Sequence, residues 1–332
     1  MLILTLWVLS FLTIFAVSIG LRVRQRVTLV SRLEDRNQLY YVTQAGIQKA
    51  IAALRKDYQR SGQNFSSYSK FYRHNNPEIF SSINLGPGVS EVVYVYPENG
   101  PGSYQKRYGV IDEESKINVN TADREELKRV IQKTAITDQN QAAQLTEAIL
   151  SWRGLGEAQL EGFYSDSYYR NLQYPYEPKH ASFEIRDELL LLQGMTPDIF
   201  EKLSPFITIY GDGQVNINTA SRTVLLALGL DETVADKILF VRRGIDGIDF
   251  TSDDYIFEKT YDIASEVKQF TELKEGEAKQ IDALNKSGKI KTNSFYYLIH
   301  AVGQLRKGKE PLSAFCVFNL RDNKIEYYKE GR

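Results

Sequence analysis

Two hydrophobic patterns follow each other in the N-terminal part of the chain. Residues 2–21 read LILTLWVLSFLTIFAVSIGL and contain no charged side chain. About twenty apolar residues, at roughly 1.5 Å each in a helix, cross the hydrocarbon core of a bilayer. Further on, apolar side chains recur every three or four residues at Ile47, Ile51, Leu54 and Tyr58, which is the pattern of one helix face. We therefore predict one continuous helix over residues 1–60, with a transmembrane segment at 2–21.

A cleaved secretory signal is the alternative interpretation of the apolar run. It is disfavoured because no basic region precedes the run, the run is long, and no small-x-small site closes it. Four arginines, Arg22, Arg24, Arg26 and Arg32, follow the span, and no Lys or Arg precedes it. The positive-inside rule would then place the C-terminal side in the cytoplasm. We expect a short basic leader to precede Met1 in the native protein.

Strand patterns flank a long helical block in the rest of the chain. Residues 90–97 alternate and are rich in Val and Tyr, and three further strand patterns follow residue 294. Between them, short helical patterns begin with acidic residues and end at Gly or Pro. The order predicts an α+β protein with a β domain at 61–119 and 291–332, and an inserted α-domain at 120–290, since a loop with close ends tolerates an insertion.

Composition and charge narrow the possible functions. Net charge is -1 and the pI is about 6.4, so no global attraction draws the chain to nucleic acid. Cys316 is the only cysteine, which excludes an intrachain disulfide and a cysteine-based zinc site. It stands in the apolar run AFCVF and is expected to be buried and inert. No HExxH or GxSxG pattern occurs, so a hydrolase is disfavoured.

One phrase occurs twice, as INVNTADREEL from Ile117 and as VNINTASRTVL from Val215. In each copy two Asn flank an apolar residue and can bond the backbone of their own turn. Thr121 and Thr219 are the expected N-caps of the helices that follow. The pattern predicts helix-hairpin-helix-like repeats. The four Asn are Asn118, Asn120, Asn216 and Asn218.

Such hairpins often bind DNA, and a membrane-anchored DNA-binding protein is the alternative function. A DNA-binding hairpin offers Gly-rich backbone N–H groups to phosphate, with basic residues nearby. Here the turn at Gly229 leads into Asp231 and Glu232, so acid stands where phosphate would bind. A structural repeat is the favoured interpretation.

The loop GIDGIDFTSDDYIFE carries four aspartates, Asp246, Asp249, Asp253 and Asp254. Calcium takes several oxygen ligands from carboxylates and backbone carbonyls, and carboxylates this close repel each other without a cation. The loop is therefore a candidate calcium site, with a solvated acidic loop as the alternative. Glu161 and Asp166 form a weaker second candidate.

Several stretches, in the same order, resemble the minor pseudopilin K family of type II secretion systems, also called general secretion pathway protein K. They include LTLWVLSFLTIFAVS, DEESKINVNTADREEL, ILSWR, YPYEPKHASFEIRDELLLLQGMTPDIFEKLSPFITIY, GQVNINTASRTVLLALG and GIDGIDFTSDDYIF. The resemblance implies a type IV pilin-like fold, in which a long N-terminal helix packs on an antiparallel sheet. It also implies a large inserted all-α domain with helix-hairpin-helix-like (SAM-like) repeats, and calcium bound there by the four aspartates.

The resemblance further implies a non-enzymatic subunit at the tip of the pseudopilus that helps to initiate its assembly for protein export across the outer membrane. Its partners would be minor pseudopilins I and J, the major pseudopilin and the inner-membrane assembly platform, with no nucleic acid. The chain would cross the bacterial inner membrane once and hold its globular part in the periplasm. Most pilins carry a Glu near the mature N-terminus, whereas no acid precedes Glu34 here, which suits a subunit with nothing stacked above it. Two features depart from the family: the prepilin leader is missing, and SWRG at residues 151–154 lacks an acid that many relatives carry.

Overall fold

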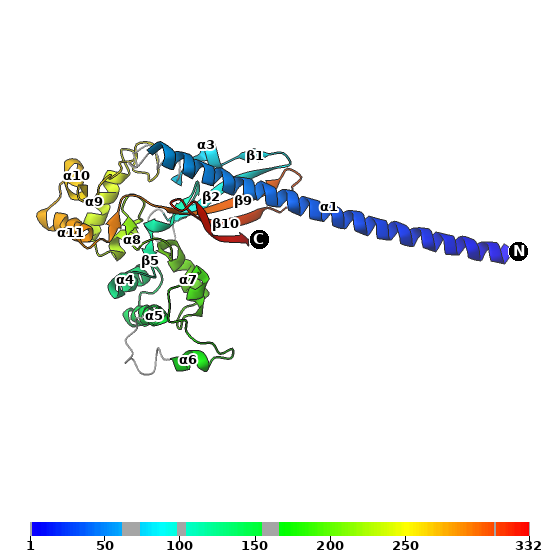
Figure 1. The fold of residues 1–332 in the computed structure, drawn as a ribbon, viewed down its shortest axis with the longest axis horizontal. Helices are drawn as coiled ribbons and strands as arrows, with labels where there is room; N and C mark the ends of the chain where they lie inside the picture. Colours follow the sequence, from blue (N-terminus) through cyan, green and yellow to red (C-terminus); the bar gives the residue numbers. More distant parts are fainter. Residues whose placement is uncertain (1, 62–73, 98–103, 155–165, 309, 332) are drawn as a thin grey trace.

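A single helix dominates the shape of the molecule. The computed structural model describes residues 2–61, 74–97, 104–154, 166–308 and 310–331. Helix α1 spans Leu2–Ser61, and at about 1.5 Å per residue it is roughly 90 Å long. Its N-terminal half projects away from all other elements (Figure 1). This confirms the predicted long N-terminal helix. The helix is continuous because no Pro interrupts it and its second half has an apolar face that packs on the sheet.

The second half of α1 packs on the sheet through that face. Ile47, Ile51 and Leu54 are almost completely buried and form one core with side chains of the sheet. Gly46 allows a close approach at this contact, since a Cβ there would lie 2.4 Å from Ser90 Oγ and 3.0 Å from Ala301 Cβ. The sheet thus holds α1 along its C-terminal half only.

The sheet is antiparallel, with the strand order β1-β2-β9-β10-β11. Strand β3 pairs with the second half of β2, and β4 pairs with the beginning of β9. This confirms the predicted antiparallel sheet. Its strands are β1 (Ile83–Leu85), β2 (Gly88–Pro97), β3 (Tyr104–Tyr108), β4 (Ile111–Asp112), β9 (Tyr296–Leu305), β10 (Leu312–Asn319) and β11 (Lys324–Gly331), and the short helix α3 (Pro77–Phe80) precedes β1.

The chain between β4 and β9 forms a helical lobe with its own hydrophobic core. Two short parallel strand pairs, β5·β6 and β7·β8, occur inside it. The lobe contains η1 (Glu113–Ser115), β5 (Ile117–Asn118), α4 (Arg124–Thr134), α5 (Gln139–Trp152), α6 (Asp166–Arg170), η2 (Arg186–Leu191), α7 (Pro197–Leu203), η3 (Ser204–Phe206), β6 (Ile207–Thr208), β7 (Val215–Asn216), α8 (Arg222–Ala227), α9 (Glu232–Arg242), α10 (Ile263–Phe270), α11 (Glu275–Lys286) and β8 (Ile290–Lys291).

The lobe lies at the end of α1 opposite to the N-terminus. Helices α9, α10 and α11 extend beyond the C-terminal end of α1, and α4, α5 and α7 lie to one side of the sheet (Figure 1). Two details differ from the sequence-based expectation. The stretch IRDELLLLQ, one of the helical patterns expected between the strands, forms a 3-10 helix over Arg186–Leu191 and no α-helix. Helices α6 and α10 were not among the expected helical patterns.

Candidate functional site

The first candidate site is the N-terminal half of α1, which no other described element covers. By length and composition, α1 is long and apolar enough to cross a membrane: its most apolar 18 residues have a mean hydropathy of 2.5, and none of them is buried. Trp7, Phe11 and Phe15 are all exposed. An apolar surface of this extent requires a covering medium or partner, since soluble monomers rarely expose one.

The second candidate is the connection between the sheet and the lobe, which we call the neck and define as residues 112–116 and 291–295. Asp112 is 2% exposed and its Oδ2 accepts three hydrogen bonds. The donors are Asn216 Nδ2 at 2.9 Å, Thr219 Oγ1 at 2.6 Å and Ser294 Oγ at 2.6 Å. Oδ1 accepts a fourth from the Glu114 N–H at 2.9 Å. One carboxylate therefore joins both passages of the neck to the lobe.

Two further buried acids complete the neck. Glu113 pairs with Lys116 at 2.5 Å and accepts a hydrogen bond from Thr208 Oγ1 at 2.6 Å. Glu114 pairs with Lys291 at 2.5 Å. Burial raises the pKa of Glu114 although the Lys291 ammonium opposes the shift, and burial lowers the pKa of Lys116. Because each charge has a partner, the cost of burying it is offset.

Each repeated phrase closes its part of the lobe in the same way. Asn120 Nδ2 donates to Phe183 O and Ile209 O while its Oδ1 accepts from Phe183 N–H. Asn218 repeats this arrangement with Phe257 and Thr292. The first Asn of each phrase bonds its own turn, as predicted: Asn118 Oδ1 accepts from Asn120 N–H, and Asn216 Oδ1 from Asn218 N–H.

The predicted N-caps of the two helices that follow are wrong. Asp123 caps α4 and Ser221 caps α8, each two residues later than expected. The Thr-Ala step belongs to a turn instead, in which Ala122 N–H donates to Asn118 O. In the second copy the Thr219 hydroxyl also donates to Asp112 in the neck.

The aspartate loop does not bring its four carboxylates together. Asp249 is buried and forms ion pairs with Arg242 at 2.7 Å and Arg243 at 3.1 Å. Its backbone carbonyl accepts a hydrogen bond from Arg107 of β3. Burial raises the pKa of Asp249, but the two guanidinium groups outweigh burial and hold that pKa below its ordinary value. Two guanidinium groups bind this carboxylate, which leaves it less available to a calcium ion, and the assignment of Asp249 as a calcium ligand stays a prediction.

The remaining aspartates accept hydrogen bonds from within the loop. Asp253 Oδ2 accepts from the N–H groups of Ile245 and Asp246, and Thr251 Oγ1 donates to both Asp253 and Asp254. The Thr251 hydroxyl and these N–H groups lower the pKa of Asp253 to about 2, whereas burial raises the pKa of Asp254 to about 6. Within the described ranges, no group of three His, Cys, Asp or Glu side chains could hold a metal ion as arranged.

The second metal candidate consists of Glu161 and Asp166. Glu161 lies outside the described residues, and Asp166 begins helix α6.

Acidic side chains surround the turn between α8 and α9. Arg222 of α8 pairs with Asp236 and Glu232 of α9. Gly229 has a φ of +97° and faces the Arg129 guanidinium, which donates to Ala227 O. The two arginines are thus engaged within the lobe and do not form an open phosphate site.

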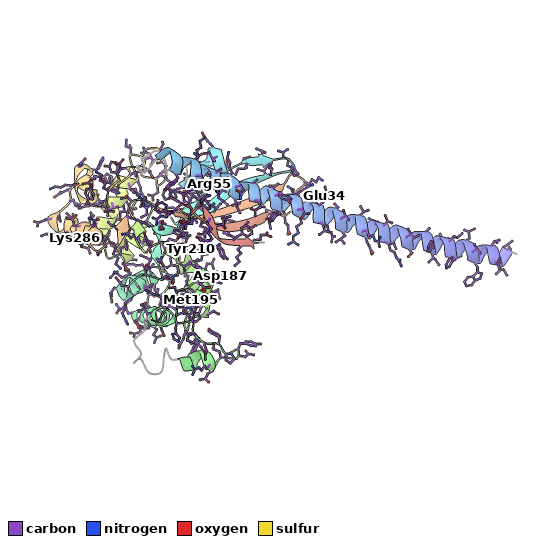
Figure 2. The ribbon with its side chains drawn as sticks, in the orientation of Figure 1. Glu34, Arg55, Asp187, Met195, Tyr210 and Lys286 are labelled. Carbon is purple, nitrogen blue, oxygen red and sulfur yellow. The ribbon has the colours of Figure 1, made fainter. Side chains whose placement is uncertain are left out.

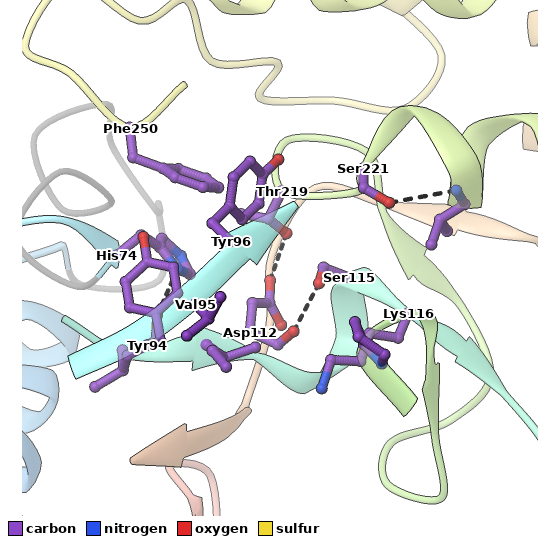
Figure 3. A pocket seen from close by; sticks show the side chains of 14 residues that line it. His74, Tyr94, Val95, Tyr96, Asp112, Ser115, Lys116, Thr219, Ser221 and Phe250 are labelled. Carbon is purple, nitrogen blue, oxygen red and sulfur yellow. Dashed lines mark hydrogen bonds between the residues drawn. The ribbon is translucent and has the colours of Figure 1, made fainter. Parts of the chain in front are cut away.

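Two cavities lie beside the lobe. One of about 60 Å³ lies between β2 and the lobe, beside Asp112, Tyr94 and Phe250 (Figure 3). Small-molecule sites are usually about 300–1,000 Å³, so this space suits water. A wider depression of about 740 Å³ between the end of α4 and α7 is open, and its lining contains no His, Cys or Ser.

Sequence reasoning missed the neck and Arg242. The only signal was the run DEESK from Asp112, which places three acids beside a strand pattern. Asp112 finds its three side-chain donors 104 to 182 residues away in the sequence, a distance that no local pattern spans.

Comparison with known proteins agrees with this architecture. A domain model described as type II secretion system (T2SS), protein K, matches residues 108–212. A chain in the crystal structure of the GspK-GspI-GspJ complex from the enterotoxigenic Escherichia coli type 2 secretion system is similar over 91% of this chain and 99% of that chain. The TM-score is 0.64 and the identity is 13%, so this likeness concerns the fold. No curated protein matches the chain. The two matches support a type II secretion protein K, which confirms the resemblance found in the sequence.

Proposed function

We propose that this chain, a type II secretion protein K, is a non-enzymatic minor pseudopilin at the tip of the pseudopilus, where it caps the filament and helps to initiate its assembly. One observation carries the proposal: a 60-residue helix is bare over its apolar half and bears, at its other end, a sheet with an inserted lobe (Figure 1). Such a helix can join neighbouring subunits along its apolar side, and burial of that side drives the association.

The position of the lobe supports the role as a cap. Helices α9, α10 and α11 lie beyond the C-terminal end of α1, which is opposite to the membrane-span candidate (Figure 1). A further subunit stacked above would have to occupy the space that the lobe fills. The absence of an acid before Glu34 agrees with this, because a carboxylate in hydrocarbon requires a partner, and a terminal subunit has no neighbour above it to supply one.

The proposed location is the bacterial inner membrane, crossed once by α1, with the globular part in the periplasm. The apolar run supports the anchor. The related complex contains GspK, GspI and GspJ by its description, and we propose that the corresponding pseudopilins I and J are direct partners here. The major pseudopilin and the assembly platform would contact the assembled tip.

The repeats in the lobe support helix-hairpin-helix-like units. The first runs from β5 to β6 and the second from β7 to β8, each closed by a parallel strand pair. In each unit the second Asn of the phrase clamps two remote backbone segments. The shared construction supports a scaffold role for the repeats.

Calcium binding by the loop stays part of the proposal for Asp246, Asp253 and Asp254. Thr251 donates to Asp253 and Asp254, and the backbone N–H of Asp246 donates to Asp253. Calcium would draw the three carboxylates of this loop together and neutralise their charge. We expect calorimetry on the chelator-treated full chain to show calcium binding that Asp253→Asn abolishes. Asp198→Asn, an exposed carboxylate of α7, is the control and should bind as wild type does. Absence of binding by the wild-type chain would contradict this part.

Co-purification tests the main proposal. The full chain, expressed with pseudopilins I and J of its own secretion system, should form a stable complex, and labelled chain should appear at pseudopilus ends. A variant with residues 118–290 replaced by a short Gly linker tests the cap. A linker can bridge the gap because the two passages of the neck lie side by side, where Glu114 Oε2 accepts a hydrogen bond from Phe295 N–H at 2.5 Å.

We expect the linker variant to bind I and J through α1 but to lose its confinement to filament ends. Labelling along the length of filaments by the intact chain would refute the cap. Salt-dependent DNA binding with no complex with I and J would favour the alternative, a membrane-anchored DNA-binding protein.

A further inference from the structure

Three arginines follow the membrane-span candidate directly, and we call Arg22, Arg24 and Arg26 the arginine collar. All three side chains are exposed. The first 33 residues contain no Asp or Glu, and within the described part of the chain no ion pair involves the collar. Figure 2 shows this part of α1, between the N-terminus and Glu34, standing clear of every other element. The collar is therefore an uncompensated group of positive charge.

The length of the helix fixes where the collar lies. Residues 2–21 span about 30 Å of hydrocarbon, and the headgroup layer beyond it is roughly 5–8 Å thick. At about 1.5 Å per residue, the three Cα atoms lie roughly 1.5 to 8 Å past Leu21. The collar thus falls within the headgroup layer, whereas Arg32 lies beyond it.

The angular distribution of the collar favours a surrounding medium over a single protein partner. Successive residues are rotated by about 100°, so Arg22 and Arg26 lie about 40° apart and Arg24 lies on the opposite side. Acidic residues of one neighbouring subunit would meet only one side. A free sector of about 160° between Arg26 and Arg24 contains the apolar stripe Val23, Val27 and Val30, which leaves room for a packed helix while the arginines stay in contact with lipid.

We propose that the arginine collar binds the phosphate groups of anionic phospholipids in the leaflet that faces the globular part. Guanidinium groups bind phosphate through two parallel hydrogen bonds, and basic residues next to a span are attracted to anionic leaflets. The collar fixes the depth of α1 in the bilayer and holds the subunit there before assembly. The inference rests on the membrane-anchored role proposed above.

The test compares lipid preference in full-length protein reconstituted in phosphatidylcholine vesicles with a minority of phosphatidylglycerol. Spin-labelled forms of the two lipids report their relative association with the protein by electron paramagnetic resonance. We expect the wild-type chain to prefer phosphatidylglycerol by about threefold or more. The triple variant Arg22→Gln, Arg24→Gln, Arg26→Gln should have a ratio close to one.

A matched control removes three charges from the same helix farther from the membrane, as Arg36→Gln, Lys49→Gln and Lys56→Gln. These side chains are exposed and lie roughly 20–50 Å past Leu21, beyond a Debye length of about 8 Å. This variant should keep the wild-type preference. An equal preference in wild type and collar variant, or an equal loss in both variants, overturns the proposal.

Two other outcomes are distinguishable. A collar variant that keeps its lipid preference but no longer binds pseudopilin I or J would assign the arginines to a protein partner and overturn the lipid assignment. A wild-type chain that does not enter vesicles at all would contradict the membrane anchor itself, and with it both proposals.

Discussion

Replacement of Asp112 by Asn tests whether the neck holds the lobe on the sheet. The side chain keeps its size but loses its charge, and one oxygen becomes an NH₂ group. In the structure Asp112 Oδ2 accepts from Asn216, Thr219 and Ser294 at 2.6–2.9 Å. The two hydroxyl groups can rotate and accept from the new NH₂, but the amide of Asn216 cannot, because it would face another donor.

The expected loss of stability follows from these hydrogen bonds. Hydrogen bonds to a charged group contribute about 1.5–3 kcal/mol each and neutral ones about 0.5–1.5 kcal/mol, so the two hydroxyl bonds lose roughly 1 kcal/mol each. The stranded Asn216 donor costs about 1–3 kcal/mol more. We expect Asp112→Asn to lower the free energy of unfolding by about 3–5 kcal/mol.

The assay is urea unfolding of the full chain in detergent, combined with hydrogen exchange of β9 and α8. Faster exchange should appear at both, since Asp112 touches both passages of the neck. Ser294→Ala removes one hydrogen bond to Asp112 and the hydroxyl that accepts from Asn216 Nδ2, and should cost about 1.5–3 kcal/mol. Asp198→Asn, in an exposed pair with Lys202, should change stability by less than about 0.5 kcal/mol. An Asp112→Asn variant as stable as Asp198→Asn would refute the reasoning.

Three further predictions concern buried charges and the thiol. Asp249→Ala leaves the guanidinium of Arg242 buried without its partner and should lower the free energy of unfolding by about 3–5 kcal/mol, measured by urea unfolding. Because the pKa of Asp254 is raised to about 6 in the fold, its ionisation destabilises the fold as pH rises through that value. Asp254→Asn, in chelator, should therefore be more stable than wild type by about 1–2 kcal/mol at pH 7.5, and the gain should vanish near pH 4. Equal stability at both pH values would contradict this. Burial raises the pKa of Cys316 to about 12, so a disulfide reagent at pH 8 should modify the thiol only after unfolding, and rapid modification of the folded chain would show the burial to be wrong.

The fold was largely predictable because its signals are local. Residues 2–61 contain no Pro, and their two apolar patterns are both helical, so α1 could be read directly. In strands β9 and β10, every second side chain points into the core shared with α1, so the sequence pattern alternates. Helix α10 was missed because its eight residues carry only two buried positions, Ile263 and Val267, too few to establish a period.

The sites were predictable only in part, because tertiary contacts decide them. Asp249 stands among aspartates in sequence, yet its partners are Arg242 and Arg243 at the C-terminal end of α9 and Arg107 of the sheet. Thr219 is a good N-cap by type, yet the carboxylate of Asp112 attracts its hydroxyl from 107 residues away. Competition among several suitable partners cannot be resolved from one segment alone.

The unbroken stem of α1 has a mechanical consequence. A helix without Pro has no built-in kink, and here its upper half is bound to the sheet along several turns. A push applied at the membrane end is therefore transmitted along the axis with little bending. The sheet and the lobe would then move together, by the same distance as the N-terminal end of α1.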